Sequence, residues 1–540
     1  MTTLPKLTDL TNSISFALEN IIKYGDTDIF PYPLEKQIFR DKKDKIIDFL
    51  SKFKVNFEEI ISQMPAEHEK LLTAVGYTGF RQGTQIDPIW NAYLLALVLS
   101  IGGDIEKSRI LPKKEMIFSY RFKPDSNSYT IFDRDYGWLA FQKKSIEHAK
   151  EHKFVLVCDI SDYYPRIYHH RLENALKKAT QKSDIIKQIK YLLNGLSKGV
   201  SYGLPIGGPA ARLLSELLLN RTDRLLLSKG VTFCRFVDDY HIFGETREEI
   251  YGNLVLLNET LLNNEGLSLQ KTKTRILSSA EFLETSSFSE ENIPDNQEEQ
   301  EKRNFLKIHI HYDPYSATAE EDYDSLCEEL SKFDIVGMLA NEMQKTRIAE
   351  GVTKKLIKAI AHISASAKNP AVLSLLENLN VLYPIFPTVM LLLKSTINTL
   401  KKATQEKIFL VLRDIIKTNS YLCKVPVNLA FIIRILAQDN SDETDAVLIN
   451  IFAETSSMLI KRDIILVLAQ HNADYWISEE LKRYNVSTPW EKRSLMVASY
   501  ILEDEGREWR KRIKNGLSDF DIIVKEWASE QKSLGRKIEI

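Results

Sequence analysis

The chain has 540 residues, 44% of them hydrophobic and 27% charged, which is ordinary soluble composition and enough length for two to four domains. Its 72 Lys and Arg residues nearly balance 74 Asp and Glu residues, which excludes a uniformly basic nucleic-acid coat but allows a local basic cleft. The four cysteines form no CxxC pair, which excludes a zinc ribbon and suits a reducing compartment. The longest apolar run, 92–101, is too short to cross a bilayer, so we expect a cytoplasmic protein without membrane contact.

The first 280 residues mix helical and strand signals. The patterns predict, in chain order, a charged amphipathic stretch within 30–62, a buried helix over 86–101, a hairpin formed by 116–122 and 128–133, a buried strand over 154–157, and two strands within 231–243 that meet at a tight turn. We therefore expect a mixed α+β domain in this half of the chain.

The second half begins after a change in composition. Residues 284–304 are acidic and rich in Ser, Asn and Gln, which predicts a linker. Residues 305–312 alternate between apolar and polar side chains, as one half-buried strand does. From about residue 320, apolar residues recur at helical spacing, and Thr488-Pro489-Trp490-Glu491 forms a capping box. Successive helices predict a HEAT-like stack of antiparallel pairs, with an irregular helical bundle as the alternative.

Three carboxylates follow the predicted strands. Asp159 ends the apolar run that starts at Phe154, and an acid there is costly unless a positive partner compensates its charge. Asp238 and Asp239 lie between two apolar strand halves, and such neighbouring charges repel unless a cation sits between them. Taken singly, Asp159 also suits a helix cap and the Asp pair a solvated turn. Together the three form an all-oxygen set, which predicts Mg²⁺ rather than zinc.

Four motifs in order over residues 154–277 resemble the palm of reverse transcriptases. Phe236-Val237-Asp238-Asp239 resembles their catalytic turn, and Asp159 followed by Tyr164 resembles their first palm motif. The loop-to-helix motif and the motif after the catalytic turn are matched by Gly203-Leu204-Pro205-Ile206-Gly207-Gly208-Pro209 and by Gly266-Leu267-Ser268-Leu269 with Lys273-Thr274. The resemblance implies an α+β fingers–palm domain that holds two Mg²⁺ ions, with Mn²⁺ as a substitute.

The resemblance also implies roles for these residues. Asp159 and Asp238 would bind the metal ions, with Asp239 as a supporting carboxylate. Tyr164 would lie under the sugar of the incoming nucleotide and clash with a 2′-hydroxyl, which implies dNTP substrates and a DNA product. A strand-edge core aromatic is the alternative for Tyr164.

The loop before the predicted helix departs from the family pattern. Gly207 allows the backbone to approach closely at this loop, where the resemblance places the nucleotide. Most template-copying relatives have Gln immediately before this glycine, where the present chain has Ile206. An Ile side chain makes no hydrogen bond, which speaks against ordinary templated copying.

Several basic side chains are candidates for binding phosphate. Lys273 is a candidate to protonate the leaving pyrophosphate or to pair with it. Arg121 on the predicted hairpin and Arg81 upstream are candidates to clamp the triphosphate, and for all three a surface position is the alternative. A basic stretch near Trp509 would hold single-stranded product or, by the favoured interpretation, form a solvated helix end; it contains Arg507, Arg510, Lys511, Arg512 and Lys514.

The whole arrangement resembles the abortive-infection and other defence-associated bacterial reverse transcriptases, which carry a HEAT-like helical domain where others have a thumb. We expect fingers and palm over 1–283 with an N-terminal extension over 1–80, a linker over 284–304 and the helical domain over 305–540.

The same resemblance implies antiphage DNA synthesis, with a noncoding RNA or further copies of the chain as partners. Some members of the group need no conventional template and are primed by one of their own tyrosines, for which Tyr24 and Tyr32 are candidates. The alternatives are a retron- or intron-like templated enzyme that uses a noncoding RNA, and a helical scaffold that carries an inactive palm.

Overall fold

The computed structural model describes residues 7, 9–30, 33–285, 305, 327, 328, 330, 332–345 and 347–540. Most of the predicted linker, residues 306–312 of the predicted strand and Tyr32 lie outside the described residues. The chain divides into two compact units. Unit 1 contains residues 1–68 and 84–292, and unit 2 contains residues 69–83 and 293–540.

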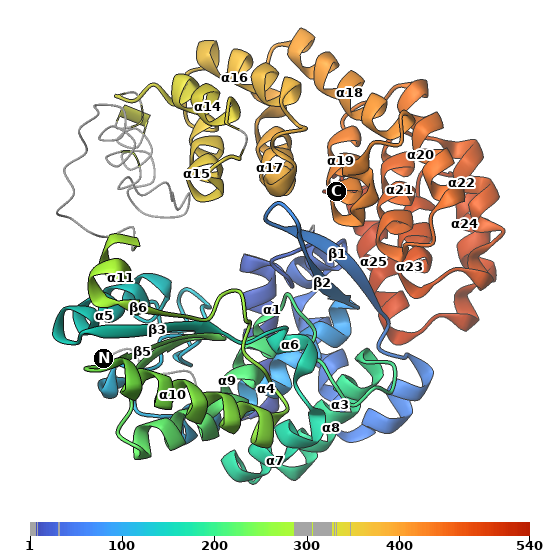
Figure 1. The fold of residues 1–540 in the computed structure, drawn as a ribbon. Coiled ribbons are helices and arrows are strands. Elements are labelled where there is room, and N and C mark those ends of the chain that lie inside the picture. Colours follow the sequence, from blue (N-terminus) through green and yellow to red (C-terminus); the bar gives the residue numbers. More distant parts are fainter. Residues whose placement is uncertain are drawn as a thin grey trace. The chain divides into compact units, whose positions relative to one another are not determined.

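Unit 1 is a mixed α/β unit around one sheet (Figure 1). Its helices are α1 (Leu10–Tyr24), α2 (Glu35–Asp41), α3 (Lys43–Gln63), α4 (Pro88–Ser108), α5 (Trp138–Glu151), α6 (Tyr163–Arg166), α7 (His169–Ala179), α8 (Ser183–Leu196), α9 (Pro209–Ser228), α10 (Arg247–Thr260) and α11 (Ser279–Thr285), with single turns at Pro112–Lys114 and Leu261–Glu265. Its sheet strands are β3 (Phe154–Asp159), β4 (Thr232–Phe236), β5 (Asp239–Gly244) and β6 (Arg275–Ser278).

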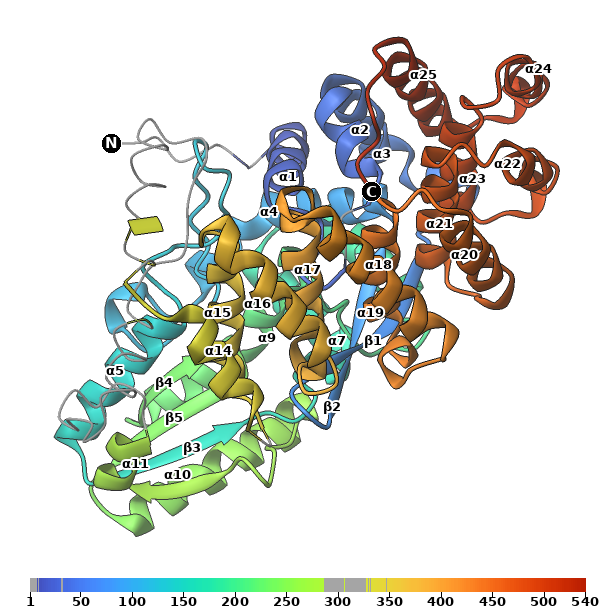
Figure 2. The same cartoon turned by 90° about the horizontal axis from the view of Figure 1, so that it is seen from above.

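The sheet has the order β4-β5-β3-β6, and its three pairings are all antiparallel. Figure 2 shows β4, β5 and β3 in this order across the sheet. One face packs against α5 and α11 through a buried cluster: Phe118, Phe141, Ala149, Val155, Cys234, Phe243 and Phe282. Helix α10 packs against the same sheet. The strands predicted within 154–157 and 231–243 are confirmed as β3, β4 and β5.

Helix α4 is the central helix of unit 1 and packs against α1, α7, α8 and α9. Its side chains are apolar almost all round, which is typical of a helix buried on every side. Pro88 occupies the first turn, and the side chain of Asp87 caps it by accepting a hydrogen bond from the backbone of Ile89 at 3.1 Å. Among the described residues α4 is also the one helix long and apolar enough to span a bilayer, but 89% of its most apolar window is buried within the protein.

The predicted hairpin over 116–133 forms with less regular pairing than expected. Phe122 and Phe132 make a single antiparallel bridge, and the backbone N–H of Lys123 donates to the carbonyl of Ile131 at 3.0 Å. Near its start, the backbone N–H of Phe118 donates to the carbonyl of Arg235 at 2.9 Å, so this segment lies alongside β4. The segment is therefore an irregular extension beside the palm sheet.

A second hairpin was not expected from the sequence pattern. Its strands are β1 (His68–Val75) and β2 (Gly79–Ile86), and residues 69–83 cluster with unit 2 although the predicted boundaries placed them in the first domain. Within unit 2 the hydroxyl of Tyr383 donates to the carbonyl of Tyr77 at 2.7 Å, with the two rings edge to face at 5.6 Å. The backbone N–H of Leu459 donates to Glu69 at 2.9 Å. These contacts give the hairpin a structural role in the helical unit.

Unit 2 is otherwise helical in its described part. Its helices are α14 (Ile335–Met343), α15 (Glu350–Ile360), α16 (Ala365–Glu377), α17 (Phe386–Thr396), α18 (Lys402–Lys417), α19 (Pro426–Leu436), α20 (Asp442–Glu454), α21 (Met458–Gln470), α22 (Asp474–Leu481), α23 (Pro489–Ala498), α24 (Asp504–Arg512) and α25 (Asp519–Ser533), with 3₁₀ turns at Tyr383–Ile385, Ile397–Thr399, Tyr421–Lys424, Tyr484–Val486 and Lys514–Gly516. The predicted capping box at Thr488 is confirmed at the start of α23.

The helices of unit 2 stack in two layers. One layer consists of α15, α17, α19, α21, α23 and α25, each packed on the next of these, and the other contains α14, α16, α18 and α20. Figure 1 shows the same succession of helices, from yellow to red. When successive antiparallel helix pairs stack, each helix packs against the helix two positions further along the chain, and two layers result. The finer HEAT-like assignment stays a prediction.

Candidate active site

The antiparallel register brings the predicted carboxylates to one end of the sheet. Asp159, the last residue of β3, is paired with Asp239, the first residue of β5. Residues directly opposite each other share a face of the sheet, with Cβ atoms about 5 Å apart. Asp238 lies in the turn just before β5, and its carbonyl accepts a hydrogen bond from Ile160 N at 3.1 Å. Residues almost 80 positions apart in the sequence therefore meet at one place.

The turn that carries Asp238 has a strained backbone. Val237 adopts φ = 57°, which is an outlier for a β-branched residue. Arg235 holds this conformation, because its Nη1 donates to the carbonyl of Val237 at 2.8 Å. Strained residues of this kind persist only where their surroundings determine them, and they gather at functional sites.

Arg235 in turn is held by buried ion pairs with two carboxylates on α9. It donates to Glu216 at 2.9 Å and to Asp223 at 2.7 Å, and Arg109 donates to the same Glu216 oxygen at 2.7 Å. Burial alone would raise the pKa of Glu216, but Arg235 and Arg109 together hold it below its usual range. The four side chains thus remain charged inside the unit and fix the turn from beneath. We call this group of side chains the buried ionic cluster; it consists of Arg109, Glu216, Asp223 and Arg235.

The carboxylate site carries excess negative charge. Burial, followed by the nearby charges of Asp238 and Asp159, raises the pKa of Asp239 to about 7. Lys273 supplies one positive charge by pairing with Asp159, and this hydrogen bond raises the pKa of Lys273 above its usual value. At Asp239 the effect of burial and of the neighbouring carboxylates outweighs that of Lys273, because the pKa of Asp239 stays raised.

The three carboxylates fit the metal ions that the sequence predicts. They offer oxygen ligands, they converge from two neighbouring strands, and their mutual repulsion is what a divalent cation would relieve. A different group, His148, Glu151 and His152, has ligand atoms within 4.8 Å of one another at the end of α5. It precedes the start of β3, on the order of 17 Å from Asp159 along the strand. Its nitrogen ligands suit softer ions, so the two places are chemically distinct.

Tyr164 lies on α6, close behind the end of β3. Its hydroxyl lies within hydrogen-bond distance of the Oγ of Ser215, at 3.3 Å, and Ser215 lies on α9. Tyr163 anchors the same turn by donating to the carbonyl of Ser215 at 2.5 Å. Burial raises the pKa of Tyr164 well above its ordinary value, so this phenol stays neutral. The ring is thus fixed between the strand that carries Asp159 and the helix that follows the glycine loop.

Gly207 has a packing role that requires glycine. Its φ is +128°, and a Cβ built on it would lie 2.5 Å from the Oγ1 of Thr27. Its carbonyl accepts a hydrogen bond from Asp28 N at 3.1 Å, and the carbonyl of Ile206 accepts one from Thr84 N at 3.0 Å. The N-terminal segment therefore lies directly against the loop, which the sequence pattern did not show.

Of the two arginines predicted to clamp the triphosphate, Arg121 lies in the interior of unit 1. Arg121 is 2% exposed and donates to Glu106 at 2.9 Å and to the carbonyls of Ile110 and Ile117. A guanidinium buried in this way cannot reach a nucleotide, so the proposed role of Arg121 is corrected to a structural one. Arg81 is exposed on β2, in the segment that clusters with unit 2.

The basic stretch on α24 is partly neutralised along its own helix. Arg507 pairs with Asp504 at 2.6 Å and Lys511 with Glu508 at 2.8 Å, while Arg510 lies over the ring of Tyr500 at 3.7 Å. These contacts agree with the favoured interpretation of a solvated helix end.

Sequence reasoning missed the polar face of α9. Glu216 and Asp223 are spaced by seven residues, so they lie on one side of a helix whose remaining buried residues are mostly apolar. Charged residues at core spacing are the signal that would have identified the buried ionic cluster.

Comparison with known proteins identifies the domain. Residues 108–310 match the family model described as reverse transcriptase (RNA-dependent DNA polymerase). The chain therefore carries a reverse-transcriptase domain. No curated protein matches the chain.

Two of the matching solved structures are telomerases. One is from Candida albicans in complex with a fragment of telomeric RNA, and the other is the apo enzyme from Candida tropicalis. Both are 10% identical to this chain with a TM-score of 0.29. The first match covers 68% of this chain and 66% of the telomerase chain, and the second covers 76% and 73%. This chain thus spans just under two thirds of the first telomerase, and a TM-score this low carries no argument about substrates.

Proposed function

We propose that the chain is a metal-dependent DNA polymerase that joins dNTPs, with Asp159, Asp238 and Asp239 as its catalytic carboxylates. The observation that carries this proposal is the pairing of Asp159 with Asp239 beside the strained Asp238 turn, in a site whose negative charge raises the pKa of Asp239. Asp159, Asp238 and Asp239 would hold a pair of Mg²⁺ ions, or Mn²⁺ in their place, which would supply activation of a 3′-hydroxyl and stabilisation of the leaving pyrophosphate.

The chain's own residues supply position and charge around that chemistry. The two strand ends present the carboxylates, and Arg235 keeps the turn between them in place. Tyr164, fixed by Ser215, forms the floor under the sugar and selects against a 2′-hydroxyl. Lys273, whose ammonium already lies at Asp159, is placed to balance the charge of the leaving pyrophosphate or to give it a proton.

The experiment that tests the proposal compares the wild type with Asp238→Asn plus Asp239→Asn. We expect Mg²⁺-dependent incorporation of labelled dNTPs by the wild type and a loss of at least a thousandfold in the double variant. A matched control is Asp48→Asn plus Asp135→Asn, two exposed acids on α3 and just after the irregular hairpin, which should retain activity. Equal activity in the wild type and the carboxylate variant would show that the site assignment is wrong.

The biological setting extends the same proposal. We place the enzyme among antiphage, abortive-infection reverse transcriptases of the bacterial cytoplasm, with the stacked helices of unit 2 as a HEAT-like domain that binds further copies of the chain or a noncoding RNA. The support is the order of the palm motifs, the two-layered helices and four cysteines that are all free thiols. Phage plating on cells that carry the wild type or the double variant tests it, because only the active enzyme should protect.

Template use separates this proposal from its main alternative. Ile206 stands where a template-contacting Gln is common in relatives, which favours untemplated synthesis. A retron- or intron-like enzyme would instead copy a noncoding RNA. Sequencing the DNA product decides between them: a sequence complementary to a co-purifying RNA supports copying, while a homopolymer or random product supports untemplated synthesis. Digestion with protease then shows whether the product is joined to a tyrosine.

A further inference from the structure

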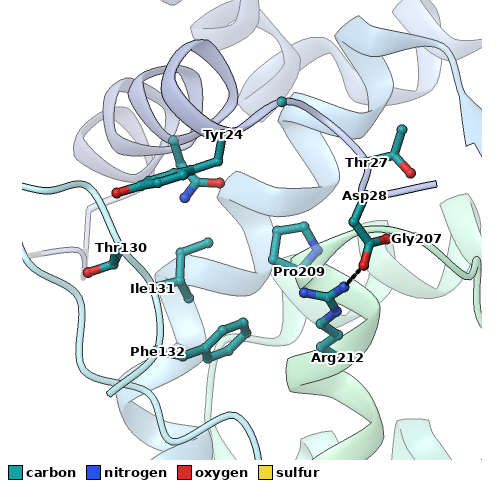
Figure 3. Close-up of a pocket in the computed structure, with 11 residues that line it drawn as sticks. Tyr24, Thr27, Asp28, Thr130, Ile131, Phe132, Gly207, Pro209 and Arg212 are labelled. Carbon is teal, nitrogen blue, oxygen red and sulfur yellow. Dashed lines mark hydrogen bonds and ion pairs between the residues drawn. The ribbon is translucent and has the colours of Figure 1, made fainter. Parts of the chain in front are cut away.

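A cavity of about 270 Å³ opens in unit 1 beside the glycine loop. Its walls come from the end of α1 and the segment after it, from the irregular hairpin at 130–132, and from the start of α9. Figure 3 shows two unlike ends: the rings of Tyr24 and Phe132 on one side, and the paired side chains of Asp28 and Arg212 on the other. An aromatic end and a cationic end are the two features that a nucleotide needs from a binding site.

Arg212 differs from the other arginines around the site. The side chains of Arg109, Arg121 and Arg235 are 2% exposed or less and lie among buried carboxylates and carbonyls. Arg212 is 29% exposed, and its partner Asp28 is 56% exposed. An ion pair with this much solvent access is weak and exchangeable, at about 1 kcal/mol or less. Arg212 is therefore available to a stronger anion.

The ring of Tyr120 helps to hold Arg212 in place. The guanidinium of Arg212 lies 5.4 Å from the centre of that ring. A planar guanidinium fixed in this way is suited to bind a phosphate through two parallel hydrogen bonds. The cationic end of the cavity is thus preorganised even without its carboxylate partner.

The backbone that carries Asp28 is fixed, although its side chain is not buried. Asn91 donates to the carbonyl of Asp26 at 2.8 Å, Gln85 donates to the carboxylate of Asp26 at 2.7 Å, and Asp28 N donates to Gly207. The close fit of Thr27 against Gly207 locks the same segment. Release of Arg212 thus needs only a rotation of the exposed Asp28 side chain.

The cavity lies next to the sugar-binding tyrosine but is separate from the metal site. Ser215 links the two, because its Oγ donates to the carbonyl of Arg212 at 2.8 Å and lies 3.3 Å from the hydroxyl of Tyr164. Within the described part of the chain, the cavity lining includes none of the three catalytic carboxylates and not Tyr164. A phosphate bound here would therefore lie outside the group of three carboxylates.

We propose that this cavity binds one nucleotide of a single-stranded nucleic acid, with its phosphate on Arg212 and its base against Tyr24 and Phe132, and that Asp28 occupies the phosphate position when no strand is bound. The inference rests on the proposed polymerase function. It adds that the carboxylate of Asp28 competes with the phosphate of the strand for Arg212. The hydroxyl of Tyr24 donates to the carbonyl of Ser128 at 2.6 Å, which holds the ring in place for stacking.

The test measures binding of a fluorescent oligothymidylate by anisotropy over a salt series in EDTA, so that no polymerisation occurs. Arg212→Ala should weaken binding and reduce the slope of log K against log salt by about 0.7, which is the value for one phosphate contact on a single strand. Arg212→Lys should keep the slope. Asp28→Asn should tighten binding by about two- to fivefold, because it removes a competitor worth up to about one surface ion pair.

Arg40→Ala and Asp41→Asn provide the matched controls, since these residues form an ion pair at 3.1 Å on α2 outside the cavity. Neither should change strand affinity beyond twofold. Melting temperatures of all variants check that each is folded, and Asp28→Asn changes only an exposed side chain. Weaker or unchanged binding by Asp28→Asn would refute the competitor role, because removing a carboxylate that merely orients Arg212 would lower the affinity for the strand rather than raise it.

Steady-state incorporation with Mg²⁺ separates the remaining outcomes. If Arg212→Ala raises KM for dNTPs while strand affinity stays the same, the phosphate is that of the incoming nucleotide and the strand assignment is wrong. If the wild type incorporates no dNTP while the binding changes above are found, the polymerase proposal fails and the strand site stands.

Discussion

Substitution of Asp239 is expected to change the folding stability and the polymerase activity in opposite directions. Its carboxyl is half-buried beside Asp159 and Asp238, and this environment raises its pKa from 3.8 to about 7. A group whose pKa is higher in the folded than in the unfolded state destabilises the fold at high pH, because unfolding lets it release its proton. We therefore expect Asp239→Asn to stabilise the metal-free protein while it abolishes polymerisation.

The magnitude and the pH window follow from the same values. A rise from 3.8 to about 7 corresponds to about 4 kcal/mol at about 1.4 kcal/mol per pH unit. Because the carboxyl is partly exposed, solvent screening reduces this, and we expect about 2 kcal/mol. Below pH 4 both states are protonated and the variant gains nothing. The gain should grow between pH 4 and 7, where only the unfolded wild type has lost its proton, and stay constant above pH 7.

Urea unfolding of the wild type and Asp239→Asn in EDTA, from pH 4.5 to 8.5, measures this difference. Asp48→Asn is the control, an exposed acid on α3 away from the sheet. Adding Mg²⁺ should stabilise the wild type and leave the variant less affected; Mg²⁺ is preferred because the His148 group favours softer ions. A difference that is independent of pH, or a destabilised variant at pH 8, would show that the three carboxylates do not interact as described.

Three further experiments probe the surroundings of the site. Tyr164→Ala should raise the ratio of ribonucleotide to deoxyribonucleotide incorporation in a competition assay, whereas Tyr164→Phe should leave that ratio unchanged; equal ratios in both variants would exclude the ring as the sugar selector. Gly207→Ala should cost about 1–3 kcal/mol in urea unfolding, and adding Thr27→Ala should recover part of this because the clash at 2.5 Å is removed while the backbone strain remains. Glu216→Gln should cost about 3–5 kcal/mol, because Arg109 and Arg235 both lose a buried charge partner; a loss below 1 kcal/mol would mean that water or movement compensates.

Short-range pattern was sufficient for the elements that form the palm. The apolar run from Phe154, the paired strands around Asp238 and the helix after Pro209 each carry their signal within a few residues, through alternation, turn chemistry and helix-start residues. The three acids stood out because charge at the end of a buried strand is costly. Their order along the chain was enough to suggest a reverse transcriptase, and the match over residues 108–310 confirms that domain.

Features that depend on what packs against an element were not visible in the sequence. Arg121 was predicted to clamp the triphosphate, with a surface position as the alternative, but Glu106 and two carbonyls surround it in the interior. Alternation tells which side of a strand a residue occupies, not whether that side meets solvent or another helix. The same reason hid the assignment of residues 69–83 to the helical unit, because the contacts of Tyr77 and Glu69 are made with residues several hundred positions away.

Short sequence segments are therefore sufficient to indicate the candidate catalytic residues of this protein, whereas the contacts of the neighbouring cavity depend on tertiary packing. Asp159, Asp238 and Asp239 predict a cation site, because each lies in a short apolar segment where an uncompensated charge is costly to bury. The meeting of Asp28 with Arg212, and of Thr27 with Gly207, joins residues about 180 positions apart and has no local energetic trace. Such contacts exist only once α1 and α9 have both packed on α4, because long-range proximity is set by how the helices pack.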